Sequence, residues 1–137
     1  MMLCDAGPLL SLIDKKQPKH EPCRKIIRKL AKPLTTTWAC FSEAMYLAYR
    51  QGGWIMQKQL GKLLLEGLLT IYEIRQEDYS RLFELIEKYK DCPMDLADAT
   101  LVLASERLGV SDILTLDSDF YVYLIHDSKP FNVLQLD

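Results

Sequence analysis

Short apolar runs alternate with longer amphipathic segments along the whole chain. Runs rich in β-forming residues predict strands over 1–4, 34–38, 68–74, 111–116 and 131–136. Apolar residues at helical spacing predict helices over 9–13, 21–31, 40–49, 54–66, 76–89 and 93–104. Strands that alternate with helices favour a mainly parallel sheet with helices on both faces. We therefore expect an α/β fold, a three-layer α/β/α sandwich with about five strands in its central sheet.

The segment from Pro93 to Ala104 has the most unusual pattern of these predicted helices. Pro93 suits a first helical position, and Gly109 suits a C-terminal cap. Apolar residues point all round the axis, which predicts a buried helix. Asp98 nevertheless lies in its second turn, with Asp95 one turn earlier on the same face. A buried carboxylate is costly unless it is paired or binds a cation, so this helix indicates a metal ion shared with acids elsewhere.

Three further acids stand at the ends of predicted elements. Asp5 follows the first strand directly, Asp117 follows the fourth, and Glu43 lies in the first turn of the helix over 40–49. Taken alone, each acid could be a turn or cap residue, or could interact with a helix dipole. In a parallel sheet, however, strand ends and the first turns of the following helices lie at one edge. We expect Asp5, Glu43, Asp98 and Asp117 to meet there.

A site made of several carboxylates favours a hard divalent cation. Neighbouring carboxylates raise one another's pKa, and a bound cation removes that conflict. Oxygen ligands suit Mg²⁺ or Mn²⁺. The four cysteines show no CxxC spacing and the two histidines stand alone, which argues against zinc. An oxygen-only site of this kind is typical of metal-dependent nucleases.

Length and net charge say little about the function of the chain, but the distribution of charge singles out one basic segment. The 137 residues fit a single domain spanning 1–137, and the net charge of −2 marks no general polyanion binder. From 15 to 32 the only acid is Glu21, whereas cations are frequent. This basic segment is either a solvated helix face or a contact for phosphates. The cations that could serve as such contacts are Lys15, Lys19, Arg24 and Arg28.

The chain shows no signal peptide and no apolar run long enough to span a membrane, so we expect a reducing, cytoplasmic setting. The tyrosines at 46, 49, 121 and 123 are interpreted as packing residues rather than as a platform for stacking bases.

Four motifs in this order resemble the PIN-domain ribonucleases, and among them the VapC-type toxins. The resemblance covers nearly the whole chain, and its motifs are Asp5-Ala6-Gly7-Pro8-Leu9, Ser42-Glu43-Ala44, Pro93-Met94-Asp95-Leu96-Ala97-Asp98-Ala99 and Leu114-Thr115-Leu116-Asp117-Ser118-Asp119-Phe120. It implies endonucleolytic cleavage of RNA with Mg²⁺ or Mn²⁺. By position, it makes a catalytic and metal-binding quartet of Asp5, Glu43, Asp98 and Asp117.

The resemblance also implies supporting residues and partners. Asp95 and Asp119 would be accessory acids, and Thr115 would be a supporting hydroxyl. Many members of the family carry Thr where this chain has Ala6, a difference that leaves the acids untouched. The family often forms homodimers, and the apolar run over 54–56 agrees with that. Its toxin members are inhibited by a small antitoxin protein whose tail enters the acidic cleft.

Two other functions fit part of this pattern. One is a PIN fold that binds a partner without cutting RNA, because fold alone does not fix function. An unused cluster of like charges, which is destabilising, argues against it. The other is a flavodoxin-like phosphoryl-transfer domain with Asp5 as the phosphate acceptor. That domain would need an acid pair beside the first strand and a Lys after a later strand, and the chain offers neither.

Overall fold

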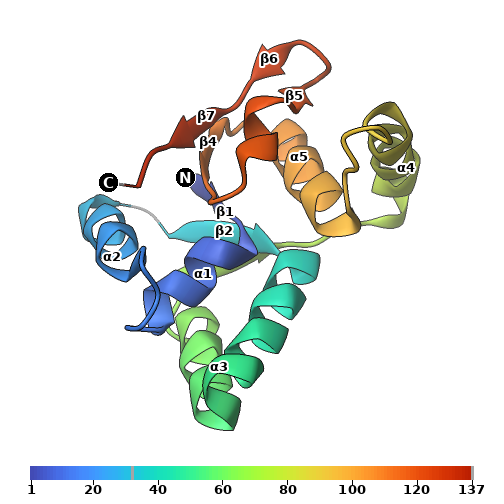
Figure 1. Ribbon diagram of the computed structural model, residues 1–137. Coiled ribbons are helices and arrows are strands. Elements are labelled where there is room, and N and C mark those ends of the chain that lie inside the picture. Colours follow the sequence, from blue (N-terminus) through green and yellow to red (C-terminus); the bar gives the residue numbers. More distant parts are fainter. Residues whose placement is uncertain (32, 137) are drawn as a thin grey trace.

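A parallel five-stranded sheet forms the centre of the computed structural model, which describes residues 1–31 and 33–136 (Figure 1). The strand order is β3-β2-β1-β4-β7, and every neighbouring pair is parallel. The strands are β1 (Met2–Cys4), β2 (Leu34–Thr37), β3 (Leu69–Tyr72), β4 (Asp112–Leu114) and β7 (Asn132–Leu134). Strand order therefore reverses beside β1, where the chain crosses from one half of the sheet to the other.

Helices cover both faces of this sheet, which confirms the predicted three-layer α/β/α sandwich (Figure 1). One face carries α1 (Ala6–Ile13), α2 (His20–Lys29) and α3 (Trp38–Leu65). The other carries α4 (Tyr79–Lys88) and α5 (Leu96–Leu108). Two 3₁₀ helices, η1 (Gln76–Asp78) and η2 (Ser118–Tyr121), and a small hairpin of β5 (Leu124–Ile125) and β6 (Lys129–Pro130) complete the described chain.

Side chains along the central strands point alternately to the two faces of the sheet, and this divides the core into two apolar clusters. Leu3 and Ile113 pack with the α4 and α5 side, whereas Met2, Cys4 and Leu114 pack with α1 and α3. All three residues of β1 are buried, as expected for a central strand of a parallel sheet covered on both faces. This burial fixes the end of β1 rigidly, and Asp5 is the next residue.

The two helices predicted over 40–49 and 54–66 are arms of a single kinked element, α3. The break lies at Gly53, whose φ of 68° and ψ of −155° are not helical. The arms project from the sheet as a helical hairpin (Figure 1). Trp38, predicted as the end of a strand, instead begins α3 because the Thr37 hydroxyl caps the helix by accepting from Cys40 N.

Helix α5 begins later than predicted. Pro93 lies in a turn, and Asp95 is the N-cap, whose side chain accepts a hydrogen bond from the backbone N–H of Asp98 at 2.8 Å. This cap places the start of the helix at Leu96, so Asp98 lies in the first turn and not the second. Residues 98–106 are buried all round the axis, as predicted, and Gly109 caps the other end with a φ of 69°.

The β5–β6 hairpin was not predicted, because strands of two residues show no alternation. Its position is fixed by the buried carboxylate of Glu106, which accepts from Arg81 at 2.8 and 2.9 Å and from His126 N at 2.8 Å. Arg81 also donates to Asp127 in the hairpin turn. Within the described part of the chain, no helix is long and apolar enough to cross a membrane.

Candidate active site

Asp5 is held by hydrogen bonds to both carboxylate oxygens. It is the N-cap of α1, where Oδ1 accepts from Ala6 N at 2.7 Å, and Oδ2 accepts from the Thr115 hydroxyl at 3.0 Å. Thr115 lies directly after β4, beside β1 in the sheet. Burial raises the pKa of Asp5, these two hydrogen bonds lower it, and the charges of Asp117 and Asp95 raise it further.

Asp117 follows β4 and caps η2. Its Oδ1 accepts from Asp119 N at 2.9 Å, and its own N–H donates to Thr115 Oγ1 at 3.0 Å. The Thr115 hydroxyl thus joins the ends of β1 and β4 in one chain of hydrogen bonds. The pKa of Asp119 is raised, chiefly by the charge of Asp117.

Asp98 enters the site from the opposite side, from the first turn of α5. Its side chain is almost buried, and its Oδ2 accepts from the Tyr123 hydroxyl at 3.1 Å. Burial raises the pKa of Asp98 to about 7, and the charge of Asp95 adds to this effect. The Tyr123 hydrogen bond opposes the rise, while the charges of Asp5 and Asp117 reinforce it.

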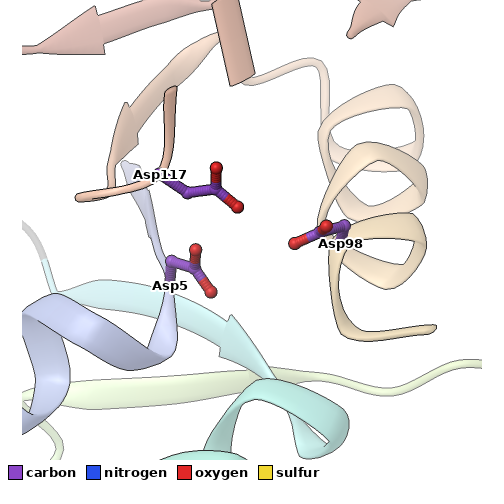
Figure 2. A group of neighbouring side chains, drawn as sticks. All are labelled: Asp5, Asp98 and Asp117. Carbon is purple, nitrogen blue, oxygen red and sulfur yellow. The ribbon is translucent and has the colours of Figure 1, made fainter. Parts of the chain in front are cut away.

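These three aspartates converge. One oxygen from each of Asp5, Asp98 and Asp117 lies within 4.8 Å of the other two, and Figure 2 shows the three carboxylates pointing toward one shared space. Three partly or fully buried negative charges at this spacing repel one another unless a cation is shared. A donor set of carboxylate oxygens alone fits Mg²⁺ or Mn²⁺ and does not fit zinc.

Glu43 stands next to this group and outside the set of three. Its side chain is exposed on the first arm of α3. Its pKa is raised by partial desolvation and then by the charges of Asp5, Asp95 and Asp117, so it lies in the field of the same acids. Asp95 contributes to that field from the N-cap of α5.

The cations of the basic segment line three different grooves. Lys19 lines a groove of about 280 Å³ together with Asp117, and Lys15 and Arg24 line a neighbouring groove of about 410 Å³. Arg24 also lines a third groove together with Arg28, next to Leu34 and Leu69 at the amino ends of β2 and β3, away from the acids. Lys32 lies outside the described residues. Of these cations, Lys19 shares a groove with one of the three aspartates.

Comparison with known proteins supplies the family. A sequence model described as the PIN domain matches residues 2–123. This chain belongs to the PIN domain family. The match extends from β1 to Tyr123 and therefore includes all three converging aspartates.

Relatives of this PIN domain are toxins and ribonucleases by name. It is 25% identical over 116 residues to ribonuclease VapC26 of Mycobacterium tuberculosis, covering 85% of this chain and 86% of that protein. Its fold matches that of M. tuberculosis VapC20, a sarcin-ricin loop cleaving toxin, with a TM-score of 0.83 and 14% identity over 95% of this chain and 100% of that one. A toxin–antitoxin complex from Klebsiella pneumoniae matches with a TM-score of 0.69 and 16% identity, covering 100% of this chain and 98% of that one.

Sequence reasoning missed one contact in the acidic site of this PIN domain. Tyr123 was interpreted as a packing residue, and its ring does pack edge-on against Tyr89 and Phe120. Its hydroxyl, however, reaches Asp98. No spacing in the sequence could reveal this hydrogen bond, because it depends on how the segment after η2 folds over α5. The interpretation of Tyr46, Tyr49 and Tyr121 as packing residues is wrong, because their side chains are 59%, 60% and 60% exposed.

Proposed function

We propose that this PIN domain is a divalent-metal-dependent endoribonuclease and the toxin of a toxin–antitoxin pair. The observation that carries the proposal is the convergence of Asp5, Asp98 and Asp117 at the carboxyl edge of the sheet. Open α/β sheets bind their ligands at this edge, where strand order reverses. Two of the relatives, a ribonuclease and a sarcin-ricin loop cleaving toxin, support the same activity here.

Asp5, Asp98 and Asp117 would hold Mg²⁺ or Mn²⁺. When bound, such an ion offsets the mutual repulsion of the carboxylates and stabilises negative charge that develops on a phosphate. Hydrogen bonds from Ala6 and Thr115 fix the Asp5 carboxylate, and one from Asp119 fixes that of Asp117. Both carboxylates are therefore oriented before an ion binds.

Glu43 is proposed to orient the attacking water and accept its proton. Its exposed position lets water reach the carboxylate, and its raised pKa makes it a better base than an ordinary glutamate. Asp95 and Asp119 are accessory acids in this proposal. They increase the negative field of the site, because each is coupled by charge to one or more of the other carboxylates.

The proposed partners follow from the same role. RNA is the substrate, a small antitoxin protein is the inhibitor, and the cytoplasm is the compartment where both would be met. The toxin–antitoxin complex among the structural neighbours supports an antitoxin. A homodimer is also proposed, supported by Trp54 and Ile55 on α3, whose side chains are 64% and 70% exposed.

The function is tested by cleavage of a mixed pool of structured RNAs with Mg²⁺, with Mn²⁺ and with a chelator. We expect cleavage only with metal, and a loss of at least about 100-fold in the Asp98→Asn variant because a metal ligand is removed. Asp91→Asn, in an exposed turn, is the matched control and should cleave normally. Equal cleavage by both variants would contradict the site, and metal binding without any cleavage would favour a non-cleaving binding module.

A further inference from the structure

A groove extends from the acidic site along the carboxyl ends of β4 and β7. It encloses about 280 Å³, and its lining includes Lys19, Thr115, Asp117, Ser118, Tyr121 and Leu136. One of the three converging aspartates thus forms part of its wall. The groove combines a cation and an exposed aromatic ring next to the site proposed for cleavage, and neither side chain has a role in the chemistry described above.

Lys19 is held in place within this groove. Its ammonium donates to the backbone carbonyl of Leu136 at 3.0 Å, which fixes the position of the charge. An ammonium has three N–H donors, so two remain for another acceptor. Among the residues that line the groove, Lys19 is the cation that can balance the nearby carboxylate of Asp117 and attract a phosphate.

Tyr121 presents an exposed ring from a fixed backbone. Its neighbours Phe120 and Tyr123 are fully buried and pack edge-on against each other, with ring centroids 5.1 Å apart. These two rings anchor the segment on both sides of Tyr121, whose side chain is 60% exposed. In the described part of the chain, the Tyr121 ring pairs with no other aromatic ring. Rigid exposed aromatic rings of this kind are the platforms on which proteins stack single-stranded bases.

We propose that this groove binds one nucleotide of a single-stranded RNA segment beside the scissile phosphate. Tyr121 stacks on its base, and Lys19 binds a backbone phosphate. This inference rests on the proposed ribonuclease function and adds to it the two residues that would bind the nucleotide next to the cut. Bases in a continuous duplex are stacked on each other and cannot reach a protein ring.

The test measures RNA binding apart from cleavage. In the Asp98→Asn background, a labelled single-stranded RNA is titrated and its fluorescence anisotropy recorded in Mg²⁺ buffer. Tyr121→Ala should weaken binding about 5- to 150-fold, the range for losing one stacked base, whereas Tyr121→Phe should bind normally. Lys19→Gln should reduce the slope of log affinity against log salt by about 0.7, the value for one phosphate contact on a single strand.

Two exposed residues elsewhere provide matched controls. Tyr79→Ala removes a tyrosine that is 51% exposed at the start of α4, and Lys58→Gln removes an exposed cation on α3. Both should leave affinity and salt slope unchanged. Tyr121→Ala and its Asp98→Asn parent should bind a duplex of the same sequence with equal affinity. If Tyr121→Ala instead weakened the binding of duplex and single strand by the same factor, the stacking role would be overturned.

The outcomes separate this inference from the proposed function. If the unmodified protein cleaves RNA while the Tyr121→Ala and Lys19→Gln variants bind and cleave as it does, the subsite is wrong and the ribonuclease function stands. If the unmodified protein neither binds nor cleaves RNA with either metal, both fail together. Thermal melting of each variant identifies any loss of affinity that comes from unfolding.

Discussion

At the scale of single residues, each converging aspartate is fixed by a different neighbour. Asp5 is held by Thr115 and the start of α1, Asp117 by the start of η2, and Asp98 by the Tyr123 hydroxyl. Groups that orient metal ligands in this way commonly change metal affinity when they are removed. Tyr123 is thus a positioning residue for Asp98.

The Tyr123→Phe variant tests this role. It removes one hydroxyl and leaves the ring packed against Tyr89 and Phe120. We expect Mn²⁺ affinity, measured by calorimetric titration, to fall about 10-fold because the Asp98 carboxylate loses its orienting hydrogen bond. Tyr72→Phe is the control, since that hydroxyl donates to Asp78, outside the group of three aspartates. Equal Mn²⁺ affinity in both variants would show that Tyr123 serves packing alone.

The sequence identified the acids better than it identified their surroundings. Asp5 could be predicted because it stands directly after β1, and Asp117 because it closely follows β4, which ends at Leu114; strand ends share an edge in a parallel sheet. The sequence could not show that Tyr123 is buried and donates a hydrogen bond while Tyr121 exposes its ring. The direction in which each side chain points depends on the turn of η2. Arg28 resembled Lys19 in sequence, yet lies at the other end of the sheet.

At the scale of elements, one glycine of α3 is needed for its backbone conformation and another is not. Gly53 adopts a φ of 68° and a ψ of −155°, a conformation that is nearly restricted to glycine. Gly61 lies within the second arm of α3, and an added Cβ there would meet nothing within 4 Å. The direction of the projecting helical hairpin therefore depends on the first glycine and not on the second.

Substitution of each glycine by alanine should change stability in opposite directions. Gly53→Ala should lower the free energy of unfolding by about 1–3 kcal/mol because alanine is strained in that conformation. Gly61→Ala should raise it by about 0.5–1 kcal/mol because alanine loses less backbone entropy in a helix. Urea unfolding of the two variants measures both values. A stabilising effect of Gly53→Ala would mean that α3 can straighten at the kink.

Element prediction succeeded where local signals were strong. Apolar strands and amphipathic helices were placed in the correct order, and the Gly52-Gly53 break was recognised. The start of α5 was wrong because Pro93 and Asp95 both offer start signals, and the side-chain cap of Asp95 decides between them. The β5–β6 hairpin depends on a long-range contact, the Glu106 carboxylate with Arg81, which no local pattern encodes.

At the scale of the whole molecule, the acidic site makes stability depend on pH. The pKa of Asp98 is raised from an ordinary 3.8 to about 7, so the folded state binds more protons than the unfolded state between these values. The stability from this group is complete below about pH 4 and is lost as pH rises through about 7. The pKa values of Asp5 and Glu43 are also raised and act in the same direction.

In chelator, the melting temperature should therefore fall by a few degrees between pH 5 and pH 8. Asp127, whose pKa is lowered to about 2 by Arg81 and Lys88, acts only at lower pH and does not disturb this window. Added Mg²⁺ or Mn²⁺ should raise the melting temperature more at pH 8 than at pH 5, since only ionised carboxylates bind the ion.

Differential scanning fluorimetry across this pH range provides the measurement, with Asp98→Asn as the reference. That variant lacks the titrating group, so its melting temperature in chelator should vary less with pH. If the variant and the unmodified protein followed the same pH curve, the raised pKa of Asp98, and with it the effect of burial on this carboxylate, would be contradicted.

The strand order has a consequence for the cell that makes this protein. The partner of the central strand β1 is β4, which follows much later in the chain, with Thr115 lying 110 residues after Asp5. A growing chain on the ribosome thus still lacks Asp98 and Asp117 when β1 emerges. The three aspartates can converge only after Asp117 has been made, so this site forms later than the central strand that anchors it.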